Sequence, residues 1–236
     1  MMKAKIWTFN TLPSTNDEAK RRASEGAPSG TVILAEEQTG GRGRLGRTFY
    51  SPKGTGIYLS MILRLNLPPE ESVRVTTAAS VAVSTAIETV TGISPQIKWV
   101  NDLYFGGKKI CGILAEMVGD AVILGVGINC STVFSGELSR IAGSLFSQDE
   151  EELRMQLIAE TILRLERMEE TLLSPVWIEE YRKRSMVLGR EVTLLQEPQS
   201  RYVAEDIGEK GELILRDAAG NLRVLASGEI SIRLAE

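Results

Sequence analysis

The pattern of apolar and turn-forming residues changes near Gly189, and this change limits the folds open to the chain. Upstream, helical periodicity predicts two long helices, Ser72–Val90 and Gln148–Leu173. Downstream, short strands separated by glycine or polar turns are typical of a small β-barrel. A chain of 236 residues can hold one large domain and a small appended one. We therefore expect a boundary near Ser185–Gly189.

Further elements follow from local patterns. Thr15-Asn16-Asp17-Glu18 has the form of a capping box, so a short polar helix is predicted to run to about Ser24. Val118-Gly119-Asp120 suits a hairpin, which indicates antiparallel neighbours. A further short helix is predicted over Trp177–Ser185. The predicted strands are Thr31–Glu36, Gly56–Leu65, Gln96–Trp99, Lys109–Met117 and Ala121–Ile128, followed by Val192–Leu195, Tyr202–Ile207, Glu212–Arg216, Arg223–Leu225 and Glu229–Ile232.

These elements predict an α+β fold. Residues 1–187 would form a mixed or antiparallel sheet packed with helices, and residues 188–236 would form the small β-barrel.

Composition excludes several classes of function. The net charge of −4 argues against general nucleic-acid binding, because such domains are usually basic. Two cysteines suggest no disulfide framework, which fits a reducing cytoplasm. We find no apolar run of a signal peptide or a membrane span, so no membrane association is expected. The chain has no histidine, so acid–base chemistry must use Lys, Asp, Glu, Tyr or the substrate.

The segment Gly40-Gly41-Arg42-Gly43-Arg44-Leu45-Gly46-Arg47 combines four glycines with three arginines. Glycine lets a backbone approach a ligand closely, and guanidinium groups pair with carboxylates and phosphates. The segment therefore indicates an anion-binding loop, with a solvated basic loop as the alternative. It formally matches the dinucleotide fingerprint, but no helix is predicted after its last glycine, as that fingerprint requires. No P-loop motif occurs either.

Two other motifs carry candidate binding residues. Lys98-Trp99-Val100-Asn101-Asp102 is followed by a strand that begins at Lys109 and contains Gly112. A glycine within a strand suggests close approach of a ligand or another backbone, whereas Asn101-Asp102 could simply begin an Asx turn. An exposed lysine at a strand end would also be unremarkable. Ser14-Thr15-Asn16 precedes the first helix, whose free N–H groups could meet an anion.

In this order and spacing, the motifs resemble the biotin protein ligase family. The resemblance runs from residue 14 to residue 232. It departs from the family at Val100, where proline is usual, and at Phe49 or Tyr50, where tryptophan is common. The elements that carry it are Ser14-Thr15-Asn16, Gln38, the arginine–glycine loop, Ser51-Pro52-x-Gly54, Lys98-Trp99-x-Asn101-Asp102, Lys108-Lys109-x-x-Gly112-Ile113-Leu114-x-Glu116, Gly125-Val126-Gly127-Ile128-Asn129 and Gly228-Glu229-Ile230-Ser231.

The resemblance implies a class II synthetase-like catalytic domain with a C-terminal SH3-like β-barrel. It implies a reaction in which biotin and ATP, with Mg²⁺, form biotinyl-5′-AMP and pyrophosphate. The biotinyl group then passes to a lysine of a biotin carboxyl carrier protein, such as that of acetyl-CoA carboxylase. Because Ser14 lies near the start of the sequence, we do not expect the DNA-binding repressor domain of some relatives. A homodimer is possible by analogy.

The resemblance also implies roles for individual residues. Lys109 would reach the biotin carboxylate and the α-phosphoryl oxygens as the main catalytic group. Arg42 and Arg44 would help to hold biotin and its adenylate, with the backbone of Gly41 and Gly43 close to the phosphate. Asp102 would orient the carrier lysine, bind Mg²⁺ or hold a neighbouring lysine. We expect the arginine–glycine loop to be mobile without ligand. The binding set is Ser14, Thr15, Asn16 and Gln38 for the ureido ring of biotin, with Gly41, Arg42, Gly43, Arg44, Lys98, Asn101, Lys109, Gly112 and Asn129.

Two other functions stay open from the sequence. One is a lipoate–protein ligase, because that group shares the fold, although it does not usually show this arginine–glycine loop. The other is a non-enzymatic nucleic-acid-binding protein that uses the loop as an RGG-like patch. Overall acidity and the lack of a clustered aromatic platform count against the second hypothesis.

Overall fold

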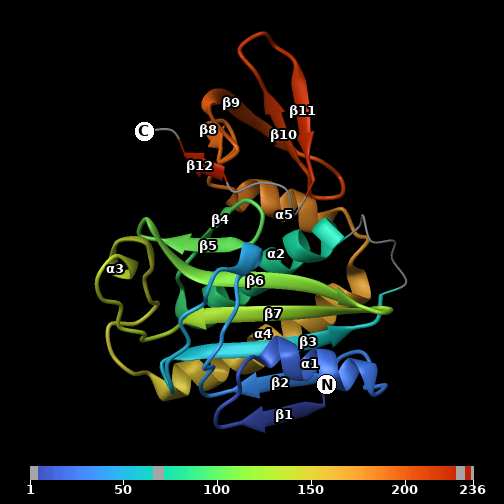
Figure 1. The fold of residues 1–236 in the computed structure, drawn as a ribbon, viewed down its shortest axis with the longest axis vertical. Helices are drawn as coiled ribbons and strands as arrows, with labels where there is room; N and C mark the ends of the chain where they lie inside the picture. The colour runs from blue at the N-terminus through green and yellow to red at the C-terminus, as the bar shows by residue number, and fades with distance from the viewer. Residues whose placement is uncertain (1–4, 66–71, 227–231, 235–236) are drawn as a thin grey trace.

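The chain forms a seven-stranded sheet with helices and, beside it, a smaller five-stranded sheet (Figure 1). The computed structural model describes residues 5–65, 72–226 and 232–234. The strands of the large sheet are β1 (Ile6–Phe9), β2 (Val32–Ala35), β3 (Gly56–Leu63), β4 (Gln96–Lys98), β5 (Asp102–Phe105), β6 (Lys108–Val118) and β7 (Ala121–Asn129). The helices are α1 (Thr15–Ser24), α2 (Ser72–Thr91), α3 (Leu138–Ile141), α4 (Glu151–Thr171) and α5 (Val176–Arg184), and a 3₁₀ turn spans Arg44–Gly46.

The large sheet is mixed, with the strand order β1-β2-β3-β7-β6-β5-β4. Among the described strands, β1 and β2 pair in parallel and the other neighbours pair antiparallel. This confirms the predicted fold class. The predicted hairpin joins β6 and β7, with Val118 paired to Ala121. Two strands were not predicted: the edge strand β1, whose Ile6 and Trp7 stay 41% and 38% exposed, and the short β5.

The two faces of the large sheet have different covers, because side chains alternate along each strand. Leu59 and Met61 of β3 belong to the main core with residues of α2 and α4. Ile62 points to the opposite face, where it packs with Ala19 and Ala23 of α1. On that face the loop between β2 and β3 runs across β7 and β6, beside α1 (Figure 1). The start of α1 and this loop both contribute residues to the lining of a cavity on that face.

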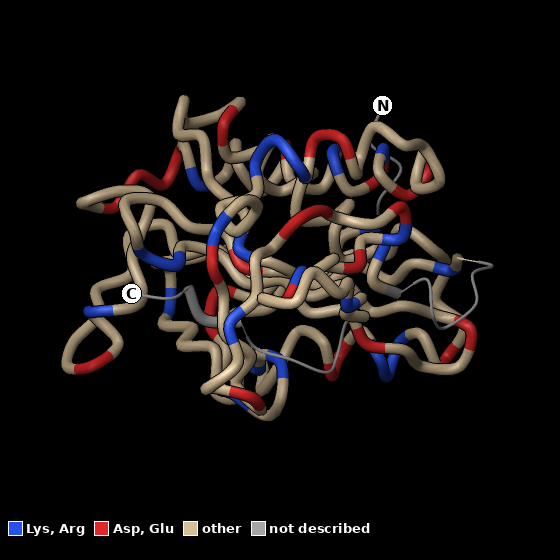
Figure 2. The backbone as a smooth tube through the Cα atoms, turned by 90° about the horizontal axis from the view of Figure 1, so that it is seen from above, with Lys and Arg blue, Asp and Glu red and all other residues tan. Residues whose placement is uncertain are grey.

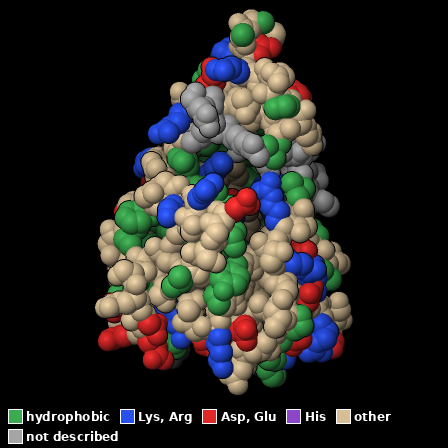
Figure 3. Space-filling model, turned by 60° about the vertical axis from the view of Figure 1, so that its left-hand side comes forward, with side chains coloured by type: hydrophobic (Ala, Val, Ile, Leu, Met, Phe, Trp, Pro, Cys, Tyr) green, Lys and Arg blue, Asp and Glu red, His purple; other side chains and the backbone are tan. Residues whose placement is uncertain are grey.

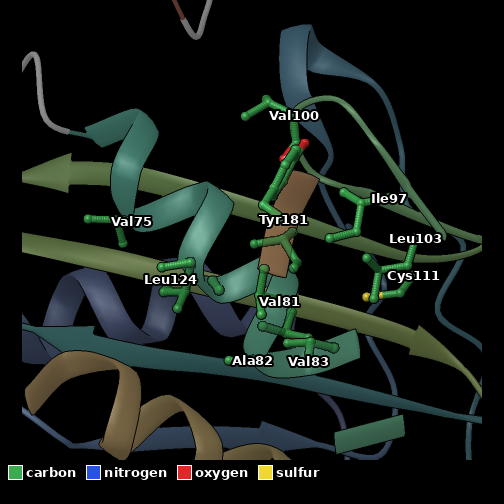
Figure 4. Packing of buried hydrophobic residues seen from close by; sticks show 14 of the residues in the cluster. Val75, Val81, Ala82, Val83, Ile97, Val100, Leu103, Cys111, Leu124 and Tyr181 are labelled. Atoms are coloured by element: carbon green, nitrogen blue, oxygen red, sulfur yellow. The ribbon is translucent and has the colours of Figure 1, made fainter. Parts of the chain in front are cut away.

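A buried core supports the turn between β4 and β5 (Figure 4). Tyr181 of α5 is fully buried, and its hydroxyl donates to the Val100 carbonyl at 3.2 Å. The Ser80 hydroxyl of α2 donates to the same carbonyl at 3.3 Å. Burial raises the pKa of Tyr181 well above its ordinary value, so the phenol stays a neutral donor. Two helices therefore hold the turn that presents Asn101 to the cavity.

The second sheet is antiparallel, in the order β11-β10-β9-β8-β12, and matches the small C-terminal β unit that was expected. Its strands are β8 (Glu191–Leu194), β9 (Glu197–Ile207), β10 (Leu213–Arg216), β11 (Leu222–Leu225) and β12 (Ile232–Leu234). Most of the predicted strand Glu229–Ile232 lies outside the described residues. Arg182 of α5 donates to both carboxylate oxygens of Asp206, and the Trp99 indole donates to the Gly211 carbonyl at 2.9 Å. The small sheet is thus attached beside the cavity.

Two local predictions were wrong. Ser14, rather than Thr15, is the N-cap of α1, and its side chain makes no capping hydrogen bond. The Thr15 hydroxyl instead donates to Gln38 Oε1 at 3.0 Å, so a tertiary partner replaces the capping box. Asp102 is the first residue of β5, paired with Lys98, and does not form part of an Asx turn. For Thr15, a contact with the distant Gln38 overrides the local preference, whereas Asp102 is placed by the tight hairpin between β4 and β5.

Candidate active site

A cavity of about 290 Å³ opens on the α1 face of the large sheet. Glycines line its floor: Gly112 of β6 pairs with Gly127 of β7, and Gly125 lies two residues away on the same face. A Cβ at Gly125 would lie 2.2 Å from Asn16 Oδ1, and one at Gly127 would lie 2.5 Å from the Phe49 ring. Since real Cβ atoms do not approach so closely, the glycines let the helix start and the loop lie directly on the strands.

The fold brings together nearly all the residues that the sequence predicted for the site. Gly41 is the exception among them; a Cβ there would lie 2.4 Å from the Phe49 carbonyl oxygen, so this glycine is required by packing within the loop. The predicted residues that line the cavity are Ser14, Thr15, Asn16, Gln38, Arg42, Gly43, Arg44, Lys98, Asn101, Asp102, Lys109, Gly112 and Asn129.

The start of α1 contributes a cluster of buried polar side chains to one end of the cavity. Thr15 donates to Gln38 Oε1 from its backbone N–H at 2.8 Å and from its hydroxyl at 3.0 Å. The Ser60 hydroxyl lies 2.8 Å from Thr15 Oγ1 and 2.5 Å from Asn16 Oδ1. Gln38 Nε2 donates to Ser51 Oγ at 3.0 Å. Partners on other elements therefore hold each side-chain amide in one orientation.

The arginine–glycine loop forms the opposite wall. Its base is closed by a hydrogen bond of 2.7 Å from the Gly43 N–H to the Arg47 carbonyl. At its tip, Leu45 adopts a φ of 56°, in the left-handed region that a side chain disfavours. This conformation costs about 1–2 kcal/mol for a residue other than glycine. The loop therefore combines a hydrogen-bonded base with a strained, exposed tip.

Two arginines of the loop, Arg42 and Arg44, line the cavity but differ in their partners and exposure. Arg42 pairs with Asp17 at the rim, where their side chains are 41% and 51% exposed. Arg44 turns inward, and its Nη1 donates to Asn101 Oδ1 at 3.1 Å. Its Nη2 is buried and has no hydrogen-bond partner within the described ranges. Burial lowers the pKa of Arg44, against the opposing effect of Asp102, but a guanidinium stays protonated. A buried cationic donor of this kind fits an anionic ligand.

Lys109 and Asp102 form an ion pair of 2.7 Å between the neighbouring strands β6 and β5. Both side chains are partly exposed to the cavity, at 31% and 24%. Lys98 lies with its Nζ 5.6 Å from the centroid of the Tyr104 ring. The charged residues that line the cavity are five basic ones against one acidic one: Arg42, Arg44, Arg47, Lys98 and Lys109 against Asp102. The cavity is therefore locally positive in an acidic chain, and it attracts anions.

Asn129 acts on the backbone around the site. Its Nδ2 donates to the Gly143 carbonyl at 3.0 Å, and the Gly143 N–H donates to the Lys109 carbonyl at 2.9 Å. Asn129 thus connects the segment after β7 to the strand that carries Lys109. Because Asn129 is buried and these bonds are internal, its placement serves the shape of the site.

Several cavity residues were not predicted as members of the site. Phe134, Leu138 and Ile141, from the segment after β7, form an apolar part of the wall, and Ile141 is 62% exposed. A helix of four residues leaves no periodicity to detect, so the sequence offered no signal there. Tyr104 belongs to the strand β5, which was also missed; burial raises the pKa of its phenol to about 12.

The charge distribution elsewhere is mixed. Basic and acidic segments alternate along the backbone in Figure 2, and on the face drawn in Figure 3 Lys and Arg side chains gather across the middle of the molecule. No helix in the described part of the chain is long and apolar enough to cross a membrane. Residues 5–65, 72–226 and 232–234 contain no group of three or more His, Cys, Asp or Glu side chains arranged to hold a metal ion.

A mixed sheet with a basic cavity on one face and a small antiparallel sheet beside it defines a class II synthetase-like fold with an added C-terminal β domain. The sequence matches the Biotin/lipoate A/B protein ligase family over residues 8–132. It matches the Biotin protein ligase C terminal domain over residues 187–233. The chain belongs to the biotin protein ligase family.

Individual relatives agree with this assignment. The chain is 30% identical to the bifunctional ligase/repressor BirA of Escherichia coli, with 95% of this chain and 73% of the relative covered. It is 32% identical to the biotin--[acetyl-CoA-carboxylase] ligase of Mycobacterium tuberculosis, with 92% of this chain and 85% of the relative covered. A biotin protein ligase from Aquifex aeolicus, solved with biotin and ATP, superposes with a TM-score of 0.80 at 28% identity, covering 98% of this chain and 99% of that one. Against two Bacillus BirA proteins the match spans about half their length, 50% and 44%.

Proposed function

We propose that this chain attaches biotin to a lysine of a carrier protein in two steps driven by ATP. In the first step a biotin carboxylate oxygen attacks the α-phosphorus of ATP, a C–O–P anhydride forms and pyrophosphate leaves. In the second step the lysine ε-amine attacks the acyl carbon, an amide forms and AMP leaves with the bonding electrons. The observation that carries the proposal is one cavity with a neutral hydrogen-bonding end and a strongly basic end.

The neutral end suits the ureido ring of biotin, which has one carbonyl acceptor and two N–H donors. We assign Ser14, Thr15, Asn16 and Gln38 to this ring. The dithiolane ring of lipoate has no such groups, so the donor and acceptor sites of these side chains that face the cavity would stay unpaired. Each unpaired group costs about 1–3 kcal/mol, and this cost favours biotin over lipoate.

The basic end suits the reacting carboxylate and phosphates. Two anions repel as they approach, and charge moves onto the leaving pyrophosphate, so fixed positive groups lower the barrier. We assign Lys109 and Arg44 to the oxygens of the reacting groups, with Arg42 and the backbone at Gly43 on the adenylate. Asp102 holds Lys109 before the anion binds and later stands beside the incoming carrier lysine.

The other predicted residues support this arrangement. Asn101 orients Arg44, because its Oδ1 accepts a hydrogen bond from the Arg44 guanidinium. Gly112 leaves room for the Lys109 side chain, because a Cβ there would lie 3.3 Å from Lys109 Cε. Lys98 adds positive charge at the wall, and Asn129 anchors the backbone next to Lys109. Mg²⁺ would enter on the phosphates of ATP and neutralise part of their charge.

The proposal extends to domains, partners and location. We propose that residues 1–187 are catalytic and that residues 188–236 form an appended β domain, acting on a biotin carboxyl carrier protein. We propose the cytoplasm as the location, which fits two free, buried cysteines. Homodimer formation is a further expectation from the family. An RNA-binding role for the arginine–glycine loop is not supported, since Arg44 points into the cavity and Arg42 pairs with Asp17.

The test is incubation of the chain with biotin, MgATP and a biotin carrier domain, followed by mass measurement of the carrier. We expect the mass of one biotinyl group to be added only when all components are present. Replacement of biotin by lipoate should give no addition. Modification with lipoate and none with biotin would instead make the chain a lipoate–protein ligase.

A further inference from the structure

A chain of polar contacts leads from the surface of α1 to the neutral end of the cavity. Lys20 Nζ donates to Glu116 Oε1 at 2.6 Å, and Asn16 Nδ2 donates to Glu116 Oε2 at 2.7 Å. Asn16 Oδ1 in turn lies 2.5 Å from the Ser60 hydroxyl. Asn16 lines the cavity, whereas Lys20, Glu116 and Ser60 do not. The contacts therefore end on a residue that a ligand can touch.

The fold places these side chains together through simple spacing. Asn16 and Lys20 are four residues apart on α1, so they lie on the same face of the helix. Glu116 belongs to β6 and shares a sheet face with Gly112, which is four residues earlier on the strand. Gly125 leaves the space that Asn16 Oδ1 occupies. Three separate elements thus converge on one amide.

The two ends of the Asn16 amide have partners of opposite kinds. The Glu116 carboxylate can only accept hydrogen bonds, so it requires the Nδ2 end. Burial raises the pKa of Glu116, but the hydrogen bonds from Lys20 and Asn16 outweigh it, and the pKa lies below its ordinary value. Glu116 is therefore charged at neutral pH. Rotation of the amide by half a turn would set Asn16 Oδ1 against this carboxylate, which is repulsive.

We propose that Glu116 is a positioning residue for Asn16, and that Lys20 holds Glu116, so that the amide of Asn16 meets a cyclic urea in one fixed orientation. This inference rests on the proposed function, because the cyclic urea is the ring of biotin. A urea ring presents an acceptor between two donors, and a reversed amide would set donor against donor or acceptor against acceptor. Glu116 and Lys20 thereby contribute to the choice of substrate without touching it.

The test is calorimetric titration of the full chain with biotin, together with steady-state kinetics for biotin and ATP. Glu116→Ala should raise the Kd and KM for biotin about 10-fold, the loss expected for a hydrogen bond to a charged group. Glu116→Gln keeps an acceptor for Asn16 and should stay within about 3-fold of the wild type. The kcat and the KM for ATP should change less than about 2-fold in both variants, because the basic end is untouched.

Two further variants keep the test decisive. Lys20→Met leaves Glu116 in place but removes its partner, and we expect a rise in the biotin Kd of about 3-fold even if Glu116→Ala fails to fold. Asp120→Ala removes the Arg64–Asp120 ion pair at the β6–β7 hairpin, outside the cavity, and should leave biotin binding unchanged. Wild-type affinity in both Glu116→Ala and Lys20→Met would overturn the inference. Failure of the wild-type chain to bind biotin would instead overturn the proposed function.

Discussion

The two ends of the cavity are built in different ways. At the neutral end, Thr15, Asn16 and Ser60 are at most 5% exposed, and each has partners on another element. At the basic end, Lys109 forms a partly exposed ion pair with Asp102, and Arg44 keeps a buried N–H group without a partner in the described part of the chain. Protein partners hold the side chains of the neutral end in place before a ligand binds, whereas the basic end has a buried N–H group that a ligand would satisfy.

This difference assigns separate tasks to the two ends. Groups held in place before binding lose little conformational freedom when a ligand arrives, so the neutral end provides affinity and selectivity. Groups that exchange one partner for another can follow charge as it moves, so the basic end lowers the reaction barrier. We therefore expect changes at the neutral end to alter mainly biotin binding, and changes at the basic end to alter mainly turnover.

The largest effect is expected from Lys109→Ala. Removal of one charged group at the reacting oxygens should lower the rate of biotinyl-adenylate formation by about 10²- to 10³-fold. Biotin-dependent exchange of pyrophosphate into ATP measures this rate. Lys108→Ala is the matched control, because Lys108 is the exposed neighbour on the same strand and does not line the cavity. Adenylate formation at the wild-type rate in Lys109→Ala would remove Lys109 from the catalytic set.

Substitution of the two loop arginines, Arg42 and Arg44, should lower activity to different extents, because one lies at the rim and the other turns inward. Arg44→Ala removes a buried charged donor and should lower kcat/KM for ATP by about 10- to 100-fold, the range for a charged hydrogen bond. Arg42→Ala removes a half-exposed ion pair and should lower it by about 5-fold or less. Initial rates at varied ATP provide the comparison. Equal losses in the two variants would contradict the distinction between an inward and a rim arginine.

More of the basic end than of the neutral end could be predicted from the sequence. The arginine–glycine loop is visible as a local motif, because its glycines and guanidinium groups suit an anion, whereas Lys109 was singled out only by the resemblance to the family. The bond between Asn16 and Glu116 joins residues a hundred positions apart, so no local pattern could reveal it. The role of Gly112 and Gly127 in the cavity floor likewise depends on the register of β6 and β7, which the sequence does not reveal.

The same reasoning explains the successes and failures in the fold. Long periodic elements such as α2 and α4 were predicted because their apolar faces repeat over 20 and 21 residues. The edge strand β1 was missed because its side chains are mostly exposed, with Trp7 covered by the Arg22 guanidinium at 3.8 Å from the ring centroid. The short β5 was missed because it directly follows turn residues. The strand β2 has the same length but is wholly apolar, and it was predicted, whereas β5 begins with the charged Asp102.

A substitution beneath the neutral end should affect binding without affecting the chemistry. Gly125→Ala would place a methyl group against Asn16 Oδ1, and relief of this overpacking costs about 1–3 kcal/mol. We expect the biotin Kd to rise about 10-fold while kcat at saturating biotin stays near the wild-type value. Calorimetry and thermal melting should be measured together. A kcat loss larger than the change in Kd would show that the two ends are not separable.

The smallest effect should be protection of the arginine–glycine loop. Trypsin should cut between Arg42 and Lys53 in the free chain, because the loop is exposed and its tip is strained. Biotin with ATP should slow this cleavage as Arg42 and Arg44 bind the adenylate. Cleavage within the small C-terminal sheet serves as the internal control and should not change. Equal cleavage of the loop with and without ligands would refute its closure over the product of the first step.

The central claim is that one cavity activates biotin with ATP, and isotope exchange tests it without a carrier protein. The wild-type chain should exchange labelled pyrophosphate into ATP when biotin and Mg²⁺ are present. Exchange should be at background when biotin is omitted or replaced by lipoate. Exchange that does not depend on biotin, or its absence with biotin, would contradict the account.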